Sequence, residues 1–382
     1  MQHQFPHAML PVALHDERAR QDFVRSYKVD VLTRLGPGNR EVFDRRAKPS
    51  YQRKTGQPPR SRREIATAMQ GDAFWQMWSS LNRSGQEMMW EALTEPAFRE
   101  RPRLVAQAQR LRRKRKSFGS LQISGDPVPR YIAAVDIHNQ PGGYGLVLGQ
   151  DDVYAGALYD LSAYHYSVGG LGPLGSDPGD STVAFLREHH RRFAPRRILD
   201  LGASIGASTL PFADAFPKAR IDAIDVSEGM MRYADARAKS LGKTIHFSQQ
   251  NAERTNLSSG SFDLIVSHLF FHETSAAAVR NVMKECHRLL APGGLMIHSD
   301  VPESNQFHPD PYDQWWRDWT THFNAEPFRS TLRDTSLSKV AVAAGFAPRN
   351  VRELKIPSAA AVGVYKKTHG YGAEWHLVVA TK

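Results

Sequence analysis

The stretch from Arg197 to Val226 limits the possible folds of this chain more strongly than any other part of the sequence. Its first apolar run, residues 197–201, stops at Gly202, and residues 209–216 then have the apolar spacing of a helix. This order predicts a buried parallel strand that turns into a helix, with a second strand at residues 221–226. Small residues at the turn let a ligand approach the backbone, so we expect a nucleotide site there.

The polar residues of this stretch favour an adenosine cofactor that carries a methionine group. Asp225 ends the second strand, where a carboxylate can accept two hydrogen bonds from a ribose. The spacing Gly202-x-Ser204-x-Gly206 is not the Gly-x-Gly-x-x-Gly pattern of dinucleotide sites. Asp200 would repel a pyrophosphate but attract an ammonium group. The residues therefore argue against NAD.

Together, these residues resemble motifs I and II of the class I S-adenosylmethionine (SAM)-dependent methyltransferases, in the UbiE-like "type 11" branch. The resemblance covers residues 183–301 and extends more weakly to residue 382. It implies an α/β fold, with a Rossmann-like seven-stranded methyltransferase sheet and helices on both faces. It also implies an enzyme with SAM as its cofactor.

The resemblance further implies which residues bind the cofactor. Two of these positions depart from the family pattern, because Asn251 replaces a common aspartate and Ser204 replaces the commonest glycine. Met230 or Met231 is expected either against the adenine or in the helix core. The implied set is Asp200, Gly202, Ala203, Ser204, Gly206, Asp225, Val226, Met230, Asn251, Ala252, Ser267 and Tyr166.

Candidate catalytic residues follow the fourth strand of the resemblance. His272 is nearest to the place where similar methyltransferases sometimes have a histidine that removes the acceptor's proton, and imidazole titrates near neutrality. Alternatively, His272 and Glu273 only brace the next helix. Tyr166 and His138 complete the catalytic candidates.

Candidate acceptor-binding residues are polar or aromatic side chains near the expected cleft. For the tryptophans, packing in the core is the alternative. These candidates are Asn139, Tyr144, Tyr159, His268, Trp315 and Trp316. The i, i+4 pair His268 and His272 has metal-ligand spacing, but the segment is strand and loop rather than helix, so we expect no metal.

Charge divides the chain into parts. Residues 1–130 hold 25 Lys and Arg against 13 Asp and Glu, whereas the remainder is nearly neutral. We expect a basic, mainly helical N-terminal extension at 1–130 and a connecting strand, helix and covering loop at 131–180. The methyltransferase domain is expected at 181–382, with an aromatic lid at 305–330.

Several local patterns predict secondary structure outside the central motifs. Residues 38–63 are rich in Pro, Gly and Arg, which suggests an extended linker, and helical patterning follows at 64–93 and 95–116. Residues 129–145 suggest a short strand that ends in a polar turn. Two strands, 359–366 and 374–381, are expected to form a closing hairpin.

The run from Arg110 to Lys116 is the strongest cluster of positive charge. It could bind RNA or an anionic surface. It could also be the solvated end of a helix, where cations suit the helix dipole. No RNA-binding motif accompanies it, so a nucleic-acid partner is possible but not favoured.

These observations predict methyl transfer from SAM to a small-molecule acceptor in specialised metabolism. Two alternatives are a cyclase that converts SAM into azetidine-2-carboxylate and methylthioadenosine, and an RNA methyltransferase that docks through its basic N-terminal region. The sequence has no long apolar run and no signal pattern, so we expect a cytoplasmic protein without a membrane partner.

Overall fold

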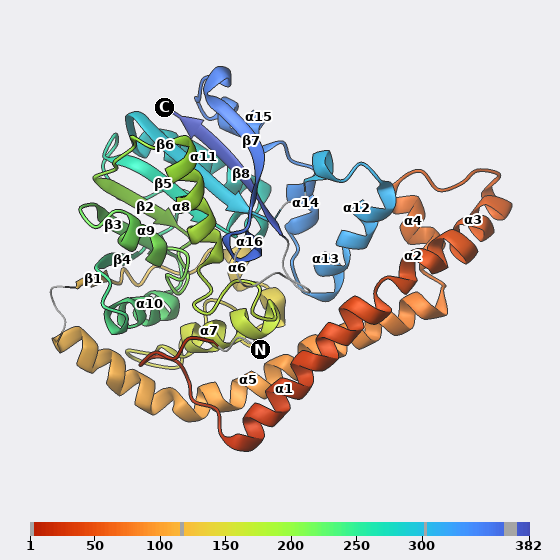
Figure 1. Cartoon of the computed structure of the whole chain (residues 1–382), viewed down its shortest axis with the longest axis horizontal. Coiled ribbons are helices and arrows are strands. Elements are labelled where there is room, and N and C mark those ends of the chain that lie inside the picture. Colours follow the sequence, from red (N-terminus) through yellow and green to blue (C-terminus); the bar gives the residue numbers. More distant parts are fainter. Residues whose placement is uncertain (1–3, 115–117, 302–303, 363–372) are drawn as a thin grey trace.

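A computed structural model describes residues 4–114, 118–301, 304–362 and 373–382 (Figure 1). Its centre is an eight-stranded sheet with the order β1-β4-β3-β2-β5-β6-β8-β7. Strand β8 runs antiparallel to β6 and β7, and the other paired strands run parallel. The strands are β1 (Gly119–Gln122), β2 (Arg197–Leu201), β3 (Arg220–Asp225), β4 (Ile245–Gln249), β5 (Phe262–His268), β6 (Leu290–Asp300), β7 (Val351–Pro357) and β8 (Glu374–Thr381). The expected α/β fold with a helical N-terminal region is confirmed, with one strand more than expected.

Helices cover both faces of the sheet. Central strands are apolar on both sides, so Ile198 of β2 packs into one core and Leu199 into the other. The first core contains α8 (Asp177–His189), α9 (Leu210–Ala215) and α10 (Glu228–Ser240). The second contains α11 (Ala276–Leu289) and α15 (Leu337–Ala343).

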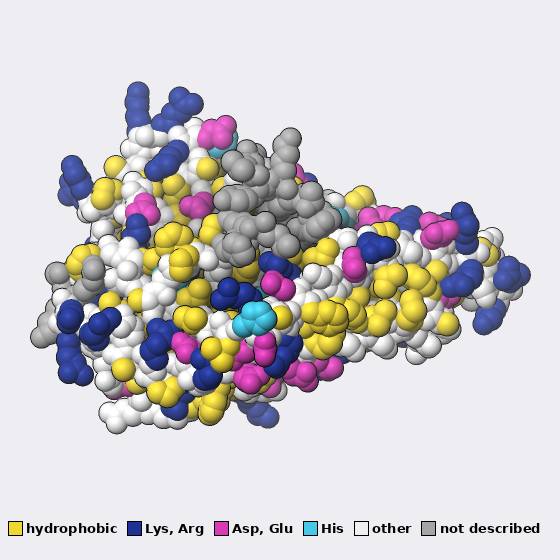
Figure 2. All heavy atoms as spheres, turned by 60° about the horizontal axis from the view of Figure 1, so that its bottom comes forward, with side chains coloured by type: hydrophobic (Ala, Val, Ile, Leu, Met, Phe, Trp, Pro, Cys, Tyr) yellow, Lys and Arg dark blue, Asp and Glu magenta, His cyan; other side chains and the backbone are white. Residues whose placement is uncertain are grey.

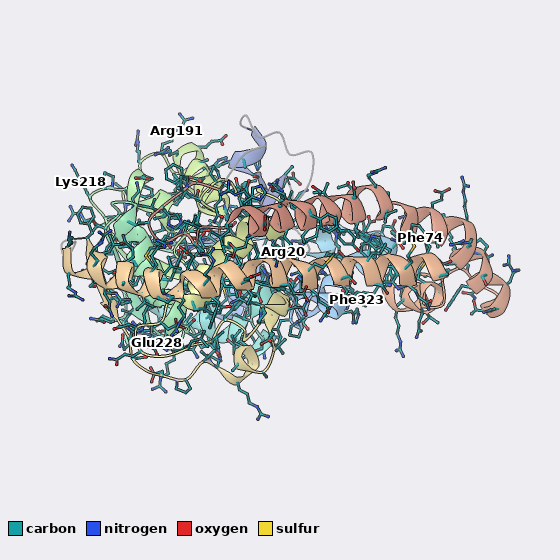
Figure 3. All side chains as sticks on the ribbon, turned by 90° about the horizontal axis from the view of Figure 1, so that it is seen from below. Arg20, Phe74, Arg191, Lys218, Glu228 and Phe323 are labelled. Carbon is teal, nitrogen blue, oxygen red and sulfur yellow. The ribbon has the colours of Figure 1, made fainter. Side chains whose placement is uncertain are left out.

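The N-terminal region is a helical arm that packs along the sheet domain. Helix α1 (His15–Asp30) lies beside α5 (Ala73–Lys114), as Figure 3 shows. Leu104 and Ala108 of α5 are buried with Met230 and Tyr233 of α10. The two helices expected at 64–93 and 95–116 are instead α4 (Arg62–Met69) and the single helix α5.

The linker expected at residues 38–63 is wrong. These residues form α2 (Gly38–Val42), α3 (Lys48–Thr55) and the start of α4, with π-helical turns at 31–35 and 43–47. These helices have few apolar side chains, and those few hold the helices in place because they pack on aromatic residues far along the chain. Phe43 and Ile65 share a buried cluster with Tyr312.

Three other expectations are corrected. Residues 129–145 form α6 (Arg130–Ala133) and a 3-10 turn at Ile137–Asn139, since His138 and Asn139 adopt left-handed backbone angles that a strand excludes. Residues 359–362 are a helix, α16, so the closing hairpin pairs β7 with β8. Residues 363–366 of the expected strand lie outside the described residues. The additional strand, β1, belongs to the segment predicted as the N-terminal extension and pairs with β4.

The remaining helices lie between the sheet domain and the arm. They are α7 (Tyr154–Tyr166), α12 (Pro311–Arg317), α13 (Trp319–Phe323) and α14 (Arg329–Arg333). In Figure 1, α12, α13 and α14 connect the sheet domain to the arm. Within the described residues, no helix has the length and hydropathy needed to span a bilayer.

Candidate active site

Two adjoining pockets open at the carboxyl ends of β2, β3 and β5. The wide pocket includes Asp225, Val226, Met230, Ala252 and Glu273 in its wall, and the narrow pocket includes Asp200, Ala203 and Gly175. Both share Tyr159, Gly202, Ser204, His268 and Leu269. The carboxyl edge of a parallel sheet is where open α/β folds bind ligands.

The turn after β2 requires glycine at its first position. Gly202 has a φ of 67°, and a Cβ there would lie 2.3 Å from the ring of Phe270. Ser204 also has a positive φ, 49°, which is uncommon for a residue with a side chain. Its backbone N–H donates to Asp225 Oδ2 at 3.0 Å, which helps hold the turn in this conformation.

Asp225 is fixed by backbone donors on both oxygens. Besides the bond from Ser204, Oδ1 accepts from the N–H of Ser227 at 2.9 Å. Burial raises the pKa of Asp225, and these backbone bonds oppose the shift. The carboxylate is therefore a positioned acceptor in the wall of the wide pocket.

Asp200 and His268 form the polar part of the narrow pocket. Asp200 Oδ2 accepts from Thr209 Oγ1 at 2.6 Å, and its Oδ1 lies 3.7 Å from Nδ1 of His268. The His268 side chain is only 2% exposed, yet neither ring nitrogen has a hydrogen-bond partner among the described residues. A buried polar group without a partner is costly, so this imidazole is poised for a ligand.

Most predicted cofactor residues meet at these pockets, but four lie outside the walls. Gly206 lies against Phe247, and Asn251 Oδ1 accepts from the backbone of Glu253 at 2.9 Å. Ser267 Oγ lies 2.6 Å from Nδ1 of His298.

Tyr166 is the fourth residue outside the walls. Its hydroxyl accepts from Asn324 at 2.9 Å, and its ring lies 5.1 Å from that of His138. Tyr166 therefore borders the catalytic candidates rather than the cofactor pockets.

The predicted catalytic residues His138, His272 and Glu273 form one buried cluster. Glu273 Oε1 lies 2.9 Å from Nε2 of His138 and 3.3 Å from Nε2 of His272. On its other side, His272 Nδ1 lies 2.6 Å from Asp300 Oδ1. Tyr144 donates its hydroxyl to Glu273 Oε1 at 3.4 Å.

Carboxylates keep the two histidines basic in spite of burial. Burial lowers the pKa of His138, but the neighbouring Glu326 and Glu273 overcome this effect and raise it to about 9. Burial also lowers the pKa of His272, but the neighbouring Asp300 outweighs this effect and raises the pKa well above its usual value. Burial raises the pKa of Glu273, but the two imidazoles outweigh this effect and lower the pKa to about 2.

Sequence reasoning missed three partners of this cluster. Asp300 ends β6 beside the end of β5, and a carboxylate at that edge was a usable signal. Asn324 and Glu326 had no such signal, because the segment after α13 reaches the cluster only through tertiary packing. Asn324 Nδ2 lies 2.8 Å from His138 Nδ1 and donates to Glu326 Oε1 at 2.6 Å.

The predicted acceptor-binding residues divide into two groups. Tyr144, Tyr159 and His268 line the wide pocket. Asn139 instead donates to the backbone carbonyl of Phe323 at 3.2 Å.

The two tryptophans pack in the core, as their alternative interpretation held. The ring of Trp315 lies 4.6 Å from that of Trp75, and the ring of Trp316 lies 4.5 Å from that of Trp78. Trp315 is buried, with 6% exposure. Neither residue belongs to the walls of the two pockets, and both pack where the arm meets the sheet domain, so their contact with the acceptor stays a prediction.

The described part of the basic run is partly engaged within the chain. Arg112 lies 3.3 Å from Asp151 and 3.5 Å from Asp235, and residues 115–117 lie outside the described residues. On the face drawn in Figure 2, Lys and Arg side chains are spread out among Asp and Glu. These contacts favour a helix end that binds to its own domain.

Comparison with known proteins points to one class. Residues 198–294 match the family model described as "Methyltransferase domain". A malonyl-[acyl-carrier protein] O-methyltransferase of Methylococcus capsulatus is 30% identical over 184 residues, which cover 47% of this chain and 62% of that protein. A demethylmenaquinone methyltransferase of Thermus thermophilus is 28% identical over 109 residues, covering 28% of this chain and 49% of that protein.

The chain thus spans less than two thirds of the length of these curated relatives. Among solved structures, a Haemonchus contortus phosphoethanolamine N-methyltransferase in complex with SAM aligns with a TM-score of 0.38 and 14% identity. That alignment covers 52% of this chain and 51% of the solved chain.

Proposed function

Because the chain carries a class I SAM-dependent methyltransferase domain, we propose that it transfers a methyl group from SAM to a small-molecule acceptor. The observation that carries this proposal is the pair of pockets around Gly202, with a backbone-fixed Asp225 at one end and Asp200 with His268 at the other. One cofactor with a ribose and an amino-acid tail would use both ends.

The polar atoms of the pockets fit the two ends of SAM. The Asp225 carboxylate is suited to a ribose diol, and the Asp200 carboxylate is suited to an ammonium group. The unpartnered imidazole of His268 is suited to a carboxylate. When bound, SAM supplies an activated methyl group on its sulfonium.

The protein's own contribution is to position the acceptor and exclude water. Tyr144 and Tyr159 line the wide pocket, with their rings 5.7 Å apart in an edge-on arrangement. Glu273 is in the same wall and is hydrogen-bonded to Tyr144. An acceptor hydroxyl bound here would lie next to the cluster of His138, His272 and Glu273, where the Glu273 carboxylate can accept its hydrogen bond.

The relatives support a small acceptor group. Their names describe methylation of malonyl-[acyl-carrier protein] and of demethylmenaquinone. We propose a small acceptor group that presents an oxygen or carbon nucleophile to the wide pocket. Specialised metabolism in the cytoplasm is the setting that we infer for this reaction.

Mass spectrometry tests the proposal and its rivals together. The full chain is incubated with SAM and a small-molecule extract, and the products are analysed. S-adenosylhomocysteine together with a methylated small molecule supports the proposal. Methylthioadenosine without S-adenosylhomocysteine would establish the cyclase instead.

A parallel incubation with RNA tests the remaining alternative. The variant with Arg110, Arg112, Arg113 and Lys114 changed to Gln serves as its control. Methylation of RNA that this variant loses would favour the RNA methyltransferase over a small-molecule enzyme.

A further inference from the structure

The cluster of His138, His272 and Glu273 has the side-chain composition of a metal centre. Two imidazoles and a carboxylate form a set that binds divalent transition metals such as Zn²⁺ and Fe²⁺ and leaves coordination positions open. One ligand atom each of His138, His272 and Glu326 lies within 4.8 Å of the other two. The sequence-based expectation of no metal considered only the pair His268 and His272, and His268 does not belong to this cluster.

The ligand atoms already converge. Glu273 Oε1 lies 2.9 Å from Nε2 of His138 and 3.3 Å from Nε2 of His272. For ligands about 2.0–2.2 Å from a metal, neighbouring donor atoms are separated by roughly these distances. Glu273 Oε2 is buried and has no hydrogen-bond partner among the described residues, so it too is available to an ion.

The other ring nitrogens have the partners that metal-bound histidines need. His272 Nδ1 lies 2.6 Å from Asp300, and His138 Nδ1 lies 3.4 Å from Glu326. The Asp300 carboxylate can direct Nε2 of His272 toward the ion and increase its basicity. Asn324, which contacts both His138 and Glu326, holds this second layer together.

The charges of the cluster leave room for a divalent cation. Glu273, Glu326 and Asp300 contribute three negative charges, and Arg329, which pairs with Glu326, contributes one positive charge. A divalent ion that replaces one proton on each imidazole brings the total to zero. Buried charge of one sign is costly, so this neutral total permits an ion in the cluster.

We propose that His138 Nε2, His272 Nε2 and the Glu273 carboxylate bind one divalent transition-metal ion at the edge of the wide pocket. Glu273 belongs both to the cluster and to the pocket wall, so the ion lies where an oxygen of a bound molecule can reach it. If the proposed methyl transfer is correct, the ion would bind the acceptor oxygen and favour its deprotonation. The metal site itself does not depend on that reaction.

A cobalt titration tests the site without any enzymatic assay. The full-length chain is stripped of metal with a chelator and titrated with Co²⁺, whose visible absorption reports coordination by nitrogen and oxygen. We expect one equivalent per chain, and displacement by Zn²⁺. Absence of both a cobalt spectrum and a calorimetric signal with Zn²⁺ would overturn the proposal.

Variants assign the ligands. His138→Gln and Glu273→Gln should weaken Co²⁺ binding at least about 10-fold, and Asp300→Asn should weaken it about 10- to 100-fold by loosening His272. His189→Gln is the matched control, because that histidine is 53% exposed at the end of α8. Binding that is equal in all four variants would also overturn the site.

Two further measurements keep the outcome clear. Circular dichroism shows whether each variant is folded. If His272→Gln fails to fold, His138→Gln decides, since His138 lies on a turn and its side chain is 15% exposed. SAM binding by calorimetry to the metal-free protein is measured separately, so failure of the metal site and failure of the proposed function are distinguished.

Discussion

His268 and His298 are buried histidines on neighbouring strands, and their ring nitrogens are in opposite situations. His298 lies 2.6 Å from Ser267 Oγ through one nitrogen and 3.9 Å from Cys286 Sγ through the other. Burial lowers the pKa of His298 to about 3, so it is a neutral core residue. His268 has no hydrogen-bond partner in the described structure and lines both pockets.

Replacing each histidine by leucine should therefore have opposite effects. His268→Leu removes an unsatisfied buried group and should stabilise the ligand-free protein by about 1–3 kcal/mol, while weakening SAM binding. His298→Leu leaves Ser267 without its partner and should destabilise the protein by a similar amount. Thermal melting with and without SAM measures both effects. Unchanged SAM binding by a folded His268→Leu variant would contradict the ligand role.

Asp225 offers the sharpest test of cofactor binding. Asp225→Ala should weaken binding of S-adenosylhomocysteine by about 2 kcal/mol, roughly 30-fold, because a charged acceptor is lost. Asp222→Ala is the control, since Asp222 lies on the same strand and pairs with Arg220 at 2.9 Å. Isothermal calorimetry gives both dissociation constants. Equal loss in the two variants would indicate damage to β3 instead of a lost contact.

At the scale of single elements, one buried carboxylate holds helix α7 in place. Asp160 accepts from Arg237 Nε at 2.8 Å and from Tyr233 Oη at 2.9 Å, and it lies 3.1 Å from His7 Nε2. Burial raises the pKa of Asp160, but Arg237 and His7 outweigh this and hold it well below its usual range. One side chain thus joins α7, α10 and the N-terminal segment.

Removing this carboxylate should be severe. Asp160→Ala leaves Arg237, which is 1% exposed, as an uncompensated buried charge, so we expect a loss of about 3–5 kcal/mol in the free energy of unfolding. Urea unfolding measures the loss. Asp16→Ala, at a side chain 92% exposed on α1, should have little effect. The double variant Asp160→Leu with Arg237→Leu should recover stability; if it does not, the ion pair is not the cause.

Helices and strands could be predicted from the sequence where burial gives the apolar residues a regular spacing. The strands after residue 196 alternate or run apolar, because both faces of the sheet are covered. The helices of residues 38–69 were not predictable, since their apolar residues pack on Tyr312 and Trp315 rather than on a local stripe. The strand predicted within residues 129–145 was wrong because the turn at His138 is stabilised from outside, by bonds from Gln86 and Trp90 to its carbonyl at 2.9 and 2.7 Å.

At the scale of the whole molecule, the arm docks through basic groups that are buried. Lys28 of α1 donates to Gln86 Oε1 at 2.7 Å, and its ammonium lies 4.9 Å from the ring centre of Tyr166. Burial lowers the pKa of Lys28 to about 7. Burial also lowers the pKa of His165 on α7 to about 4. Docking therefore disfavours the protonated form of both side chains.

Stability should consequently rise with pH through these two groups. The unfolded chain holds the Lys28 proton up to about pH 10.5, whereas the folded chain releases it at about pH 7, so the contribution increases between these values. His165 acts in the same direction between about pH 4 and 6.5. Lys28→Met should raise the melting temperature relative to the unchanged protein. This increase should be largest below about pH 7 and shrink toward pH 10.5. Lys54→Met, at an exposed site, should show no such trend, and a flat difference for Lys28→Met would contradict the assignment.

The cofactor end of the site was accessible to sequence reasoning, because it is built from consecutive residues. A turn that needs a positive φ selects Gly202, and a strand end places Asp225 beside it; both requirements act over a few residues. The α/β order of the elements follows from the same local patterns. The turn, the strand end and the order of the elements are therefore set by the local sequence.

The other side of the pocket depended on tertiary structure. His138 and His272 come from two 3-10 turns, Asp300 from a strand end and Glu326 from a segment after α13, and only folding of the entire chain brings them within a few ångströms. Their protonation is equally non-local, because burial and neighbouring charges, not residue type, set each pKa. The long arm likewise owes its place to side chains buried across its interface with the sheet domain, where apolar contact is non-directional and leaves no fixed spacing along the chain.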